Sequence, residues 1–233
     1  MVIGDDISML KQLYHGSSNI IEKPIFGYGK SYNDYGLGFY CTDSIEMAKE
    51  WGVGIEQDGY ANCYEIEMDG LKILDLNAPE YCILHWLTVL LQTREFDIPS
   101  GLALEAKEYL LENFAVTYEE YDVIIGYRAD DSYFSFAQDF INGTISYGQL
   151  NNAMHLGKLG QQFVLKSRLA FDRIRFVGYE TAESSDWYAR KMFRDKTARR
   201  EYFSVERNKR QRGDLYIIQI MDEEMKSDDP RLR

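Results

Sequence analysis

The order of strand and helix patterns along the chain constrains its fold more than any other feature. Segments with the apolar patterns of strands lie between amphipathic segments, but the two kinds do not alternate regularly. A doubly wound parallel sheet requires regular alternation, so the sequence predicts an α+β domain. The expected strands cover residues 11–15, 60–68, 71–76, 121–127, 161–166 and 174–179. The expected helices cover residues 44–51, 80–93, 102–113, 132–141, 146–155 and 184–208, and residues 215–225 form a final helix or strand.

Two local signals add detail to this pattern. Ser44 has the side chain of a helix N-cap and stands directly before an apolar-periodic segment. Asp69-Gly70 is a turn signal between the expected strands 60–68 and 71–76. The second signal predicts that these two strands pair as a hairpin.

The composition indicates a globular chain without a membrane-spanning segment. With 233 residues, 45% of them hydrophobic, the chain can form one large domain or a domain with an appendage. The apolar run from Ile83 to Leu91 is interrupted by His85 and is too short for a bilayer. Residues 1–6 carry neither a basic region nor a signal-peptide core. We therefore expect a cytoplasmic protein with no membrane partner.

The cysteines and histidines do not predict a metal site. Cys41, Cys63 and Cys82 are odd in number and lack CxxC spacing, which favours reduced structural thiols. His85 and His155 have no partners at the spacing of metal ligands, so we expect structural or surface roles for them.

Charge is distributed unevenly along the chain. The formal net charge is −12, yet residues 190–212 contain ten basic and three acidic residues, which leaves about −19 on the remainder. Such a basic strip is either a solvated helix face or a local phosphate-binding surface. We expect it to lie apart from the ligand-binding cleft.

Two short motifs near the N-terminus carry groups that suit a flat aromatic amide joined to a ribose. The motif Leu13-Tyr14-His15-Gly16-Ser17 ends an expected strand, and Gly36-Leu37-Gly38-Phe39-Tyr40 precedes an expected helix. His15 can bond a ribose hydroxyl, and Gly16 has no Cβ to hinder the approach of a carboxamide. Tyr40 and Trp51 offer stacking faces, although each of these residues could also be an ordinary core residue. The candidate ligand is NAD, held without a Rossmann fold.

These motifs resemble the first two motifs of the ADP-ribosyltransferases of the poly(ADP-ribose) polymerase and diphtheria-toxin type. The whole chain also resembles an uncharacterised bacterial family with this catalytic core, through residues 121–126 and 129–131, the strand after Gln162, and residues 228–232. The resemblance implies a split antiparallel or mixed β-sheet with peripheral helices. It implies a catalytic domain over residues 1–183 and a C-terminal helical extension with the basic strip over residues 184–233.

The resemblance also implies residue roles. His15, Gly16 and Ser17 would bind NAD, with His15 on the adenosine-side ribose and the backbone of Gly16 on the nicotinamide amide. Tyr40 would stack on the nicotinamide ring, and Trp51 would take the aromatic position on the opposite side.

Two positions depart from the family pattern. Ala48 stands where the family often has a serine that bonds the amide, and Gln162 stands where the family has its catalytic glutamate. Glutamine keeps a hydrogen bond but supplies neither a negative charge nor a base. The third position could instead be taken by Gln161 or by Asp130 and Asp131. The catalytic set is therefore His15, Tyr40 and Gln162, and polymer synthesis is not expected.

The resemblance implies a mono-ADP-ribosyltransferase, a glycosyltransferase that uses NAD as co-substrate and requires no metal. Its acceptor would be a protein or a nucleic acid. Enzymes of this kind are often toxins of toxin–antitoxin or phage-defence systems, so an antitoxin is a possible partner. Two alternatives stay open: a catalytically inert module that binds NAD or ADP-ribose, and an RNA 2′-phosphotransferase. The latter needs basic residues in its core, and the sequence offers none outside the C-terminal strip.

Overall fold

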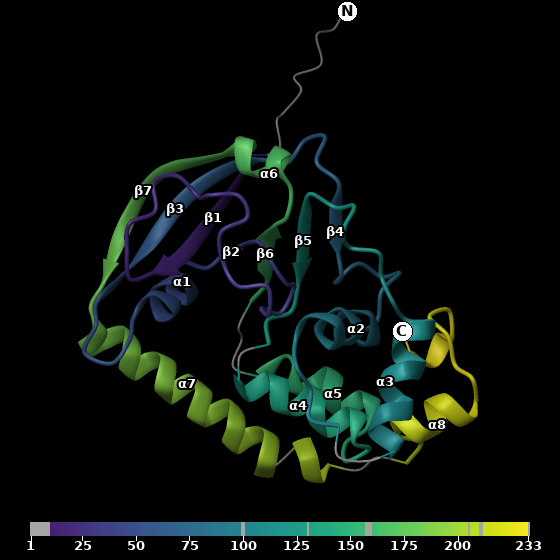
Figure 1. The fold of residues 1–233 in the computed structure, drawn as a ribbon. Helices are drawn as coiled ribbons and strands as arrows, with labels where there is room; N and C mark the ends of the chain where they lie inside the picture. The colour runs from purple at the N-terminus through teal and green to yellow at the C-terminus, as the bar shows by residue number, and fades with distance from the viewer. Residues whose placement is uncertain are drawn as a thin grey trace, which may run out of the picture.

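The computed structural model describes residues 10–98, 101–129, 131–156, 160–204, 206–209 and 212–232. Its centre is a mixed sheet with the strand order β4-β5-β6-β2-β1-β3-β7, and several helices cover one end of it (Figure 1). The pairing of β4 with β5 is parallel, and the other strand pairs are antiparallel. The predicted α+β class is therefore confirmed.

The elements agree with most of the predicted segments. The strands are β1 (Leu10–Ser17), β2 (Phe39–Thr42), β3 (Gly59–Glu67), β4 (Ile73–Asp75), β5 (Val123–Gly126), β6 (Gln162–Leu165) and β7 (Ile174–Ala182). The α-helices are α1 (Ile45–Gly52), α2 (Ile83–Thr93), α3 (Gly101–Asn113), α4 (Asp131–Ile141), α5 (Tyr147–Ala153), α6 (Arg168–Arg173), α7 (Ser184–Ser204) and α8 (Ile217–Asp222). Short 3-10 helices follow at Glu206–Asn208 and Pro230–Leu232. The segment 215–225, left open between helix and strand, contains α8.

Strand register brings the two N-terminal motifs together. β2 lies between β1 and β6, with Tyr14 opposite Thr42 on one side and Thr42 opposite Gln162 on the other. The following helix α1 begins where expected, because the Ser44 hydroxyl accepts a hydrogen bond from the Met47 N–H at 3.2 Å. The ends of β1, β2 and β6 therefore meet beside α1.

The predicted hairpin between residues 60–68 and 71–76 is wrong. The turn itself exists, since Gly70 has φ +72° and the Leu71 N–H donates to the Met68 carbonyl. However, β3 already pairs with β1 on one edge and with β7 on the other. The chain after the turn instead joins β5, where the Lys72 N–H donates to the Asp122 carboxylate at 2.8 Å.

The central strands bury both of their faces in two different cores. Ile124 and Val164 belong to the larger core, which they share with residues of α2, α3, α4, α5 and α8. Their neighbours Val123 and Phe163 belong to a smaller core on the other face, together with Ala170 of α6. This alternation is the period of two expected for a strand that is covered on both faces.

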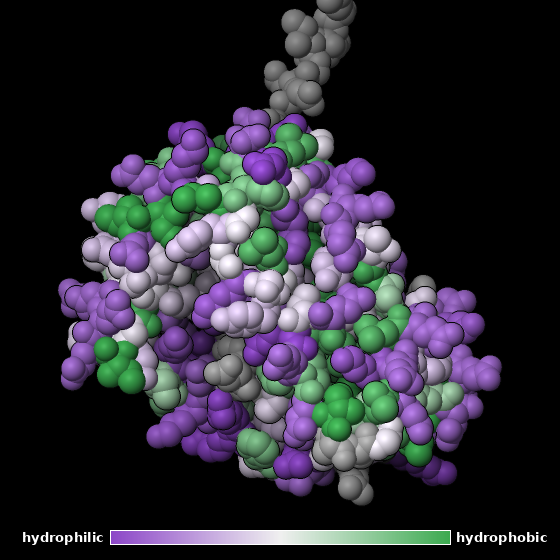
Figure 2. Space-filling model, in the orientation of Figure 1, coloured by the Kyte–Doolittle hydropathy of each residue, from purple (hydrophilic) through white to green (hydrophobic). Residues whose placement is uncertain are grey.

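The C-terminal segment packs on the larger of the two cores. Ala198 and Tyr202 of α7 are buried in the larger cluster, as are Ile217 and Ile220 of α8. Figure 1 shows α7 crossing beneath α1 and reaching α4, and Figure 2 shows mainly hydrophilic residues over it. The division of the chain at residue 184 stays a prediction. Among the described residues, no helix has the length and apolar character needed to cross a membrane.

Candidate functional site

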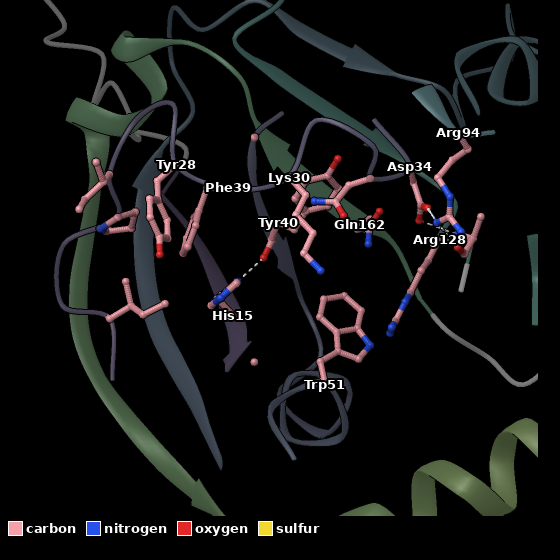
Figure 3. Close-up of a pocket in the computed structure, with 18 of the residues that line it drawn as sticks. His15, Tyr28, Lys30, Asp34, Phe39, Tyr40, Trp51, Arg94, Arg128 and Gln162 are labelled. Atoms are coloured by element: carbon pink, nitrogen blue, oxygen red, sulfur yellow. Dashed lines mark hydrogen bonds and ion pairs between the residues drawn. The ribbon is translucent and has the colours of Figure 1, made fainter. Parts of the chain in front are cut away.

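A cavity of about 950 Å³ lies beside the ends of β1, β2 and β6 (Figure 3). Its remaining walls come from α1, from the loop 18–38 that joins β1 to β2, from the segment after β5, and from α7. The volume is at the upper end of the range of pockets that hold small molecules and cofactors. The cavity is therefore large enough for a dinucleotide.

Most of the predicted site residues line this cavity. His15, Gly16, Tyr40, Trp51 and Gln162 all contribute to its walls, although they come from four different elements. Ser17 is placed differently: its hydroxyl donates to the Asn19 carbonyl at 2.5 Å and accepts from the Asn62 amide at 3.1 Å. Ser17 therefore holds the turn after β1.

His15 is oriented by its neighbours in the sheet. Its Nδ1 lies 2.6 Å from the Tyr40 carbonyl oxygen, and its ring stacks on Phe39 with centroids 4.5 Å apart. Because a carbonyl oxygen only accepts, Nδ1 must carry the proton. Burial lowers the pKa of His15, so the ring is neutral near pH 7 and Nε2 is left as a hydrogen-bond acceptor. Such an atom can accept a hydrogen bond from a ribose hydroxyl.

The Tyr40 hydroxyl is used by the protein itself. It donates to the Gly36 carbonyl at 2.5 Å and accepts from the Tyr35 N–H at 3.0 Å. Burial raises the pKa of Tyr40 far above its ordinary value, so the hydroxyl stays protonated. The two bonds fix the ring and leave its face as the part available to a ligand.

Glycine at position 16 has a packing reason in the structure. A Cβ on Gly16 would lie 2.0 Å from the Ala48 carbonyl oxygen and 2.8 Å from Trp51 Cβ. The missing side chain therefore allows α1 to pack on β1. Gly16 also lines the cavity, and the approach of a carboxamide to its backbone stays a prediction. Ala48 is itself fully buried. The close packing positions Trp51 on the cavity wall.

Trp51 and Gln162 each present an unmatched polar atom. The indole Nε1 of Trp51 and the side-chain Oε1 of Gln162 are buried and have no hydrogen-bond partner within the described part of the chain. Gln162 is only 6% exposed. An unmatched buried polar group costs about 1–3 kcal/mol, so the site is suited to a ligand that offers an acceptor to Trp51 and a donor to Gln162. A ribose hydroxyl is such a donor.

Asp34 is a cavity residue that the sequence did not indicate. It is 7% exposed and accepts hydrogen bonds from the Ala129 N–H at 2.8 Å and from Arg94 at 2.9 Å. Burial raises the pKa of this carboxyl from 3.8 to about 6, while the Ala129 N–H and Arg94 act in the opposite direction. Asp34 therefore ties the loop 18–38 to the segment after β5 and to the end of α2.

Basic residues dominate the charged part of the lining. Six basic residues line the cavity against two acidic ones, Asp34 and Asp195. The basic residues are Lys23, Lys30, Arg94, Arg128, Lys191 and Arg199. Arg128 lies over the Trp51 ring, with its guanidinium carbon 4.1 Å from the ring centroid (Figure 3). Lys191 and Arg199 share α7, and the other four cations come from separate parts of the chain, so no single sequence motif marks the set.

The expectation that the basic strip lies apart from the cleft is wrong. Lys191, Asp195 and Arg199 of α7 line the cavity together with the N-terminal motifs. The physical reason is that α7 packs against α1 and α4, which places one of its faces on the cavity.

The other candidates contribute little. Gln161 is exposed, directly before β6. Asp130 and the side chain of Asp131 lie outside the described residues. His85 is buried and its Nδ1 accepts from the Cys82 N–H, while His155 is exposed on the end of α5. The three cysteines are free. The described ranges contain no group of three or more His, Cys, Asp or Glu residues placed to hold a metal ion.

Fold and site together define an α+β protein with a mixed sheet and a large cavity lined by aromatic and basic residues. The chain belongs to the family described as "Protein of unknown function (DUF3990)", whose model matches residues 11–176. The match covers all seven strands in part or whole and ends before α7. No curated protein and no solved structure matches the chain.

Proposed function

We propose that the protein is a mono-ADP-ribosyltransferase that cleaves NAD and transfers ADP-ribose to a macromolecule. The observation that carries the proposal is the convergence of His15, Tyr40, Trp51 and Gln162 on one cavity from β1, β2, α1 and β6. The motifs that resemble the ADP-ribosyltransferases are far apart in sequence, so a shared cavity is the outcome expected of a real site.

The sheet is compatible with the ADP-ribosyltransferase-like fold that we propose. In Figure 1, β1, β3 and β7 are inclined to β6, β5 and β4, as in a sheet that is split into two halves. The motif strand β2 lies at the junction of the halves, between β1 and β6. A site at this junction can be contacted from both halves and from α1.

The cavity residues suit the chemistry of glycosidic cleavage. His15 Nε2 and Gln162 Oε1 would accept hydrogen bonds from ribose hydroxyls, and the Tyr40 ring face would hold the nicotinamide. The bond between ribose C1′ and the nicotinamide nitrogen breaks, and its electron pair leaves with nicotinamide. The acceptor's nucleophile then bonds to C1′ and loses its proton. Gln162 brings no negative charge to the ribose as positive charge develops there, so we expect slow turnover.

Two alternatives rest on specific observations. Gln162 in place of a glutamate favours a module that binds NAD or ADP-ribose without cleaving it. Arg94 and Arg128 line the cavity from outside the C-terminal strip, so the basic core residues that an RNA 2′-phosphotransferase requires are available. NAD turnover separates the first alternative from an enzyme, and an RNA substrate with a 2′-phosphate tests the second.

The decisive experiment follows nicotinamide release from NAD by the purified full chain and NAD binding by calorimetry. We expect binding and slow release, both weakened about tenfold or more by His15→Ala through the lost ribose contact. The matched control is His155→Ala, because His155 is exposed in the turn after α5 and does not line the cavity. Binding without release would favour the inert module, and absence of binding would overturn the proposal. Mass spectrometry of protein and RNA from cells that express the chain identifies the acceptor.

Substitution of the glutamine tests the third catalytic position. We expect Gln162→Ala to lower release and Gln162→Glu to maintain or raise it, because a carboxylate stabilises positive charge on the ribose. Gln161→Ala and Gln161→Glu are the matched controls on the neighbouring exposed residue. If only the Gln161 variants change the rate, Gln161 holds the third position.

A further inference from the structure

One face of α7 forms part of the cavity wall. Lys191, Asp195 and Arg199 are spaced four residues apart, so they lie above one another on the same side of the helix. All three line the cavity. This face therefore presents two cations and one carboxylate to whatever the cavity holds.

Contacts at the middle and near the C-terminal end of α7 hold it in this position. In the middle, Arg194 Nε lies 2.8 Å from the Glu50 carboxylate of α1, and both side chains are nearly buried, at 12% and 10% exposure. Near the C-terminal end, the Tyr202 hydroxyl donates to Asp139 of α4 at 2.6 Å and its ring stacks on Phe136. Glu50 immediately precedes Trp51, so α7 and the aromatic wall are fixed relative to each other.

The cavity lining carries more basic than acidic residues, and α7 contributes two of the cations. The two lining carboxylates have cationic neighbours, Asp34 at 2.9 Å from Arg94 and Asp195 at 3.2 Å from Arg194. The lining still contains more basic than acidic residues, although the chain as a whole carries −12. A concave site with low-dielectric walls focuses such a field and attracts anions.

We propose that α7 and Arg128 form a phosphate-binding wall, on which Lys191, Arg199 and Arg128 bind the diphosphate of a nucleotide held in the cavity. Arginine binds phosphate oxygens through a fork of N–H donors, and lysine adds a compact positive charge. Arg128 holds its charge beside Trp51, with its guanidinium carbon 4.1 Å from the ring centroid. The identity of the nucleotide as NAD rests on the proposed function; the phosphate wall does not.

The wall gives the C-terminal segment a role in ligand selection. The family match ends at residue 176, so α7 lies beyond the part of the chain that the family model describes. This contact depends on the position and charge of α7 and not on the two N-terminal motifs. The cavity should therefore prefer a nucleoside diphosphate to the nucleoside alone.

Calorimetry on the full chain tests the wall with ADP, inorganic pyrophosphate and adenosine as probes. We expect the affinity for ADP to exceed that for adenosine by about tenfold or more, because only ADP can accept charge-assisted hydrogen bonds through its phosphates. Pyrophosphate should compete with ADP. The advantage of ADP should shrink as salt rises from about 50 mM to about 200 mM, because phosphate contacts are screened.

The test variant combines Lys191→Glu with Arg199→Glu, and the matched control combines Lys196→Glu with Arg200→Glu. The control residues are exposed on the same helix and give the same change in net charge. We expect the test variant to lose about tenfold or more in ADP affinity with adenosine unaffected, and the control to stay within about twofold. Circular dichroism shows whether the charge-reversal variant folds. If it does not, the milder variant that combines Lys191→Ala with Arg199→Ala replaces it.

The outcomes separate this inference from the proposed function. Equal ADP affinity in test and control variants would overturn the phosphate wall, even if NAD is cleaved. Loss of ADP binding in the test variant alone would support it, even if no nicotinamide is released. Binding of a short single-stranded oligonucleotide through α7, with ADP no tighter than adenosine, would assign the cations to a phosphodiester backbone and overturn the proposal.

Discussion

The cavity has two walls of different construction. On the sheet side, His15, Tyr40 and Gln162 are positioned by backbone register and by the close packing of α1 on β1. On the helix side, the charged residues are positioned by side-chain contacts, such as Arg128 over Trp51 and Arg194 on Glu50. The first wall depends on the fold as a whole, while the second depends on electrostatic contacts that respond to pH, salt and single substitutions. Changes in the two walls should therefore have different consequences.

The largest effect is expected where α1 meets the sheet. Gly16→Ala would place a Cβ 2.0 Å from the Ala48 carbonyl oxygen, and neither backbone can yield without moving α1. We expect a loss of about 4 kcal/mol or more in the free energy of unfolding, measured by urea denaturation. NAD binding should disappear with it, because Trp51 moves with the helix.

The control for this substitution is Gly148→Ala in α5. A Cβ at Gly148 would meet no atom within 4 Å, and alanine favours a helix over glycine by about 1 kcal/mol. Stability should therefore stay equal or rise. If Gly16→Ala behaves like Gly148→Ala, the packing account of the sheet-side wall is wrong.

The ion pair between the two walls should give the next largest effect. Glu50→Gln removes one of the two carboxylates beside the nearly buried Arg194 guanidinium and leaves Asp195 at 3.2 Å. We expect a loss of about 3 kcal/mol in the free energy of unfolding, the lower end of the range for a broken buried pair, because Asp195 stays in place. Glu46→Gln is the control, because Glu46 is exposed on the same helix, and it should change stability by less than about 0.5 kcal/mol. Equal effects of the two substitutions would show that Glu50 does not hold α7.

The same contrast explains what the sequence could reveal. That His15, Tyr40 and Trp51 lie near one another could be predicted, because two local motifs and the helix after them carry all three residues. The pairing of β4 with β5 could not be predicted, because it joins residues about 50 positions apart. It also depends on β3 being paired on both edges, with β1 and β7. The cavity face of α7 was also missed, because helix spacing shows which residues share a face and not what the face meets. Its position follows from tertiary contacts such as Arg194 with Glu50.

A pH-dependent effect is expected at Asp34, which lies in the loop 18–38 and pairs with Arg94 on the cavity lining. Its pKa is raised to about 6 in the folded chain, so the folded state holds this proton more tightly than the unfolded state does. The stabilisation from the protonated carboxyl is present below about pH 4 and is lost as the pH rises to about 6. Asp34→Asn removes this titration.

Urea denaturation of wild type and Asp34→Asn at several pH values measures the difference. We expect the free energy of unfolding of the wild type to fall relative to the variant by on the order of 2 kcal/mol between about pH 4 and about pH 6. Parallel profiles for the two proteins would show that the Asp34 carboxyl titrates normally and that Arg94 fully offsets its burial.

The smallest effect on stability is expected where the two walls touch, at Trp51. Trp51→Phe keeps an aromatic face for Arg128 but removes Nε1–H, which has no partner among the described residues. Stability should change by less than about 1 kcal/mol, because no hydrogen bond within the protein is lost. NAD affinity should still fall severalfold if a ligand acceptor meets this N–H.

Trp187→Phe is the matched control. Trp187 lies on α7 outside the cavity lining, with Lys49 and Arg190 over its ring. If calorimetry shows lower NAD affinity for Trp51→Phe alone, the indole N–H of Trp51 donates a hydrogen bond to the ligand. Equal NAD affinities for the two variants would show that Trp51 Nε1–H does not bond the ligand. Trp51 would then contribute only its ring, through packing in the sheet-side wall.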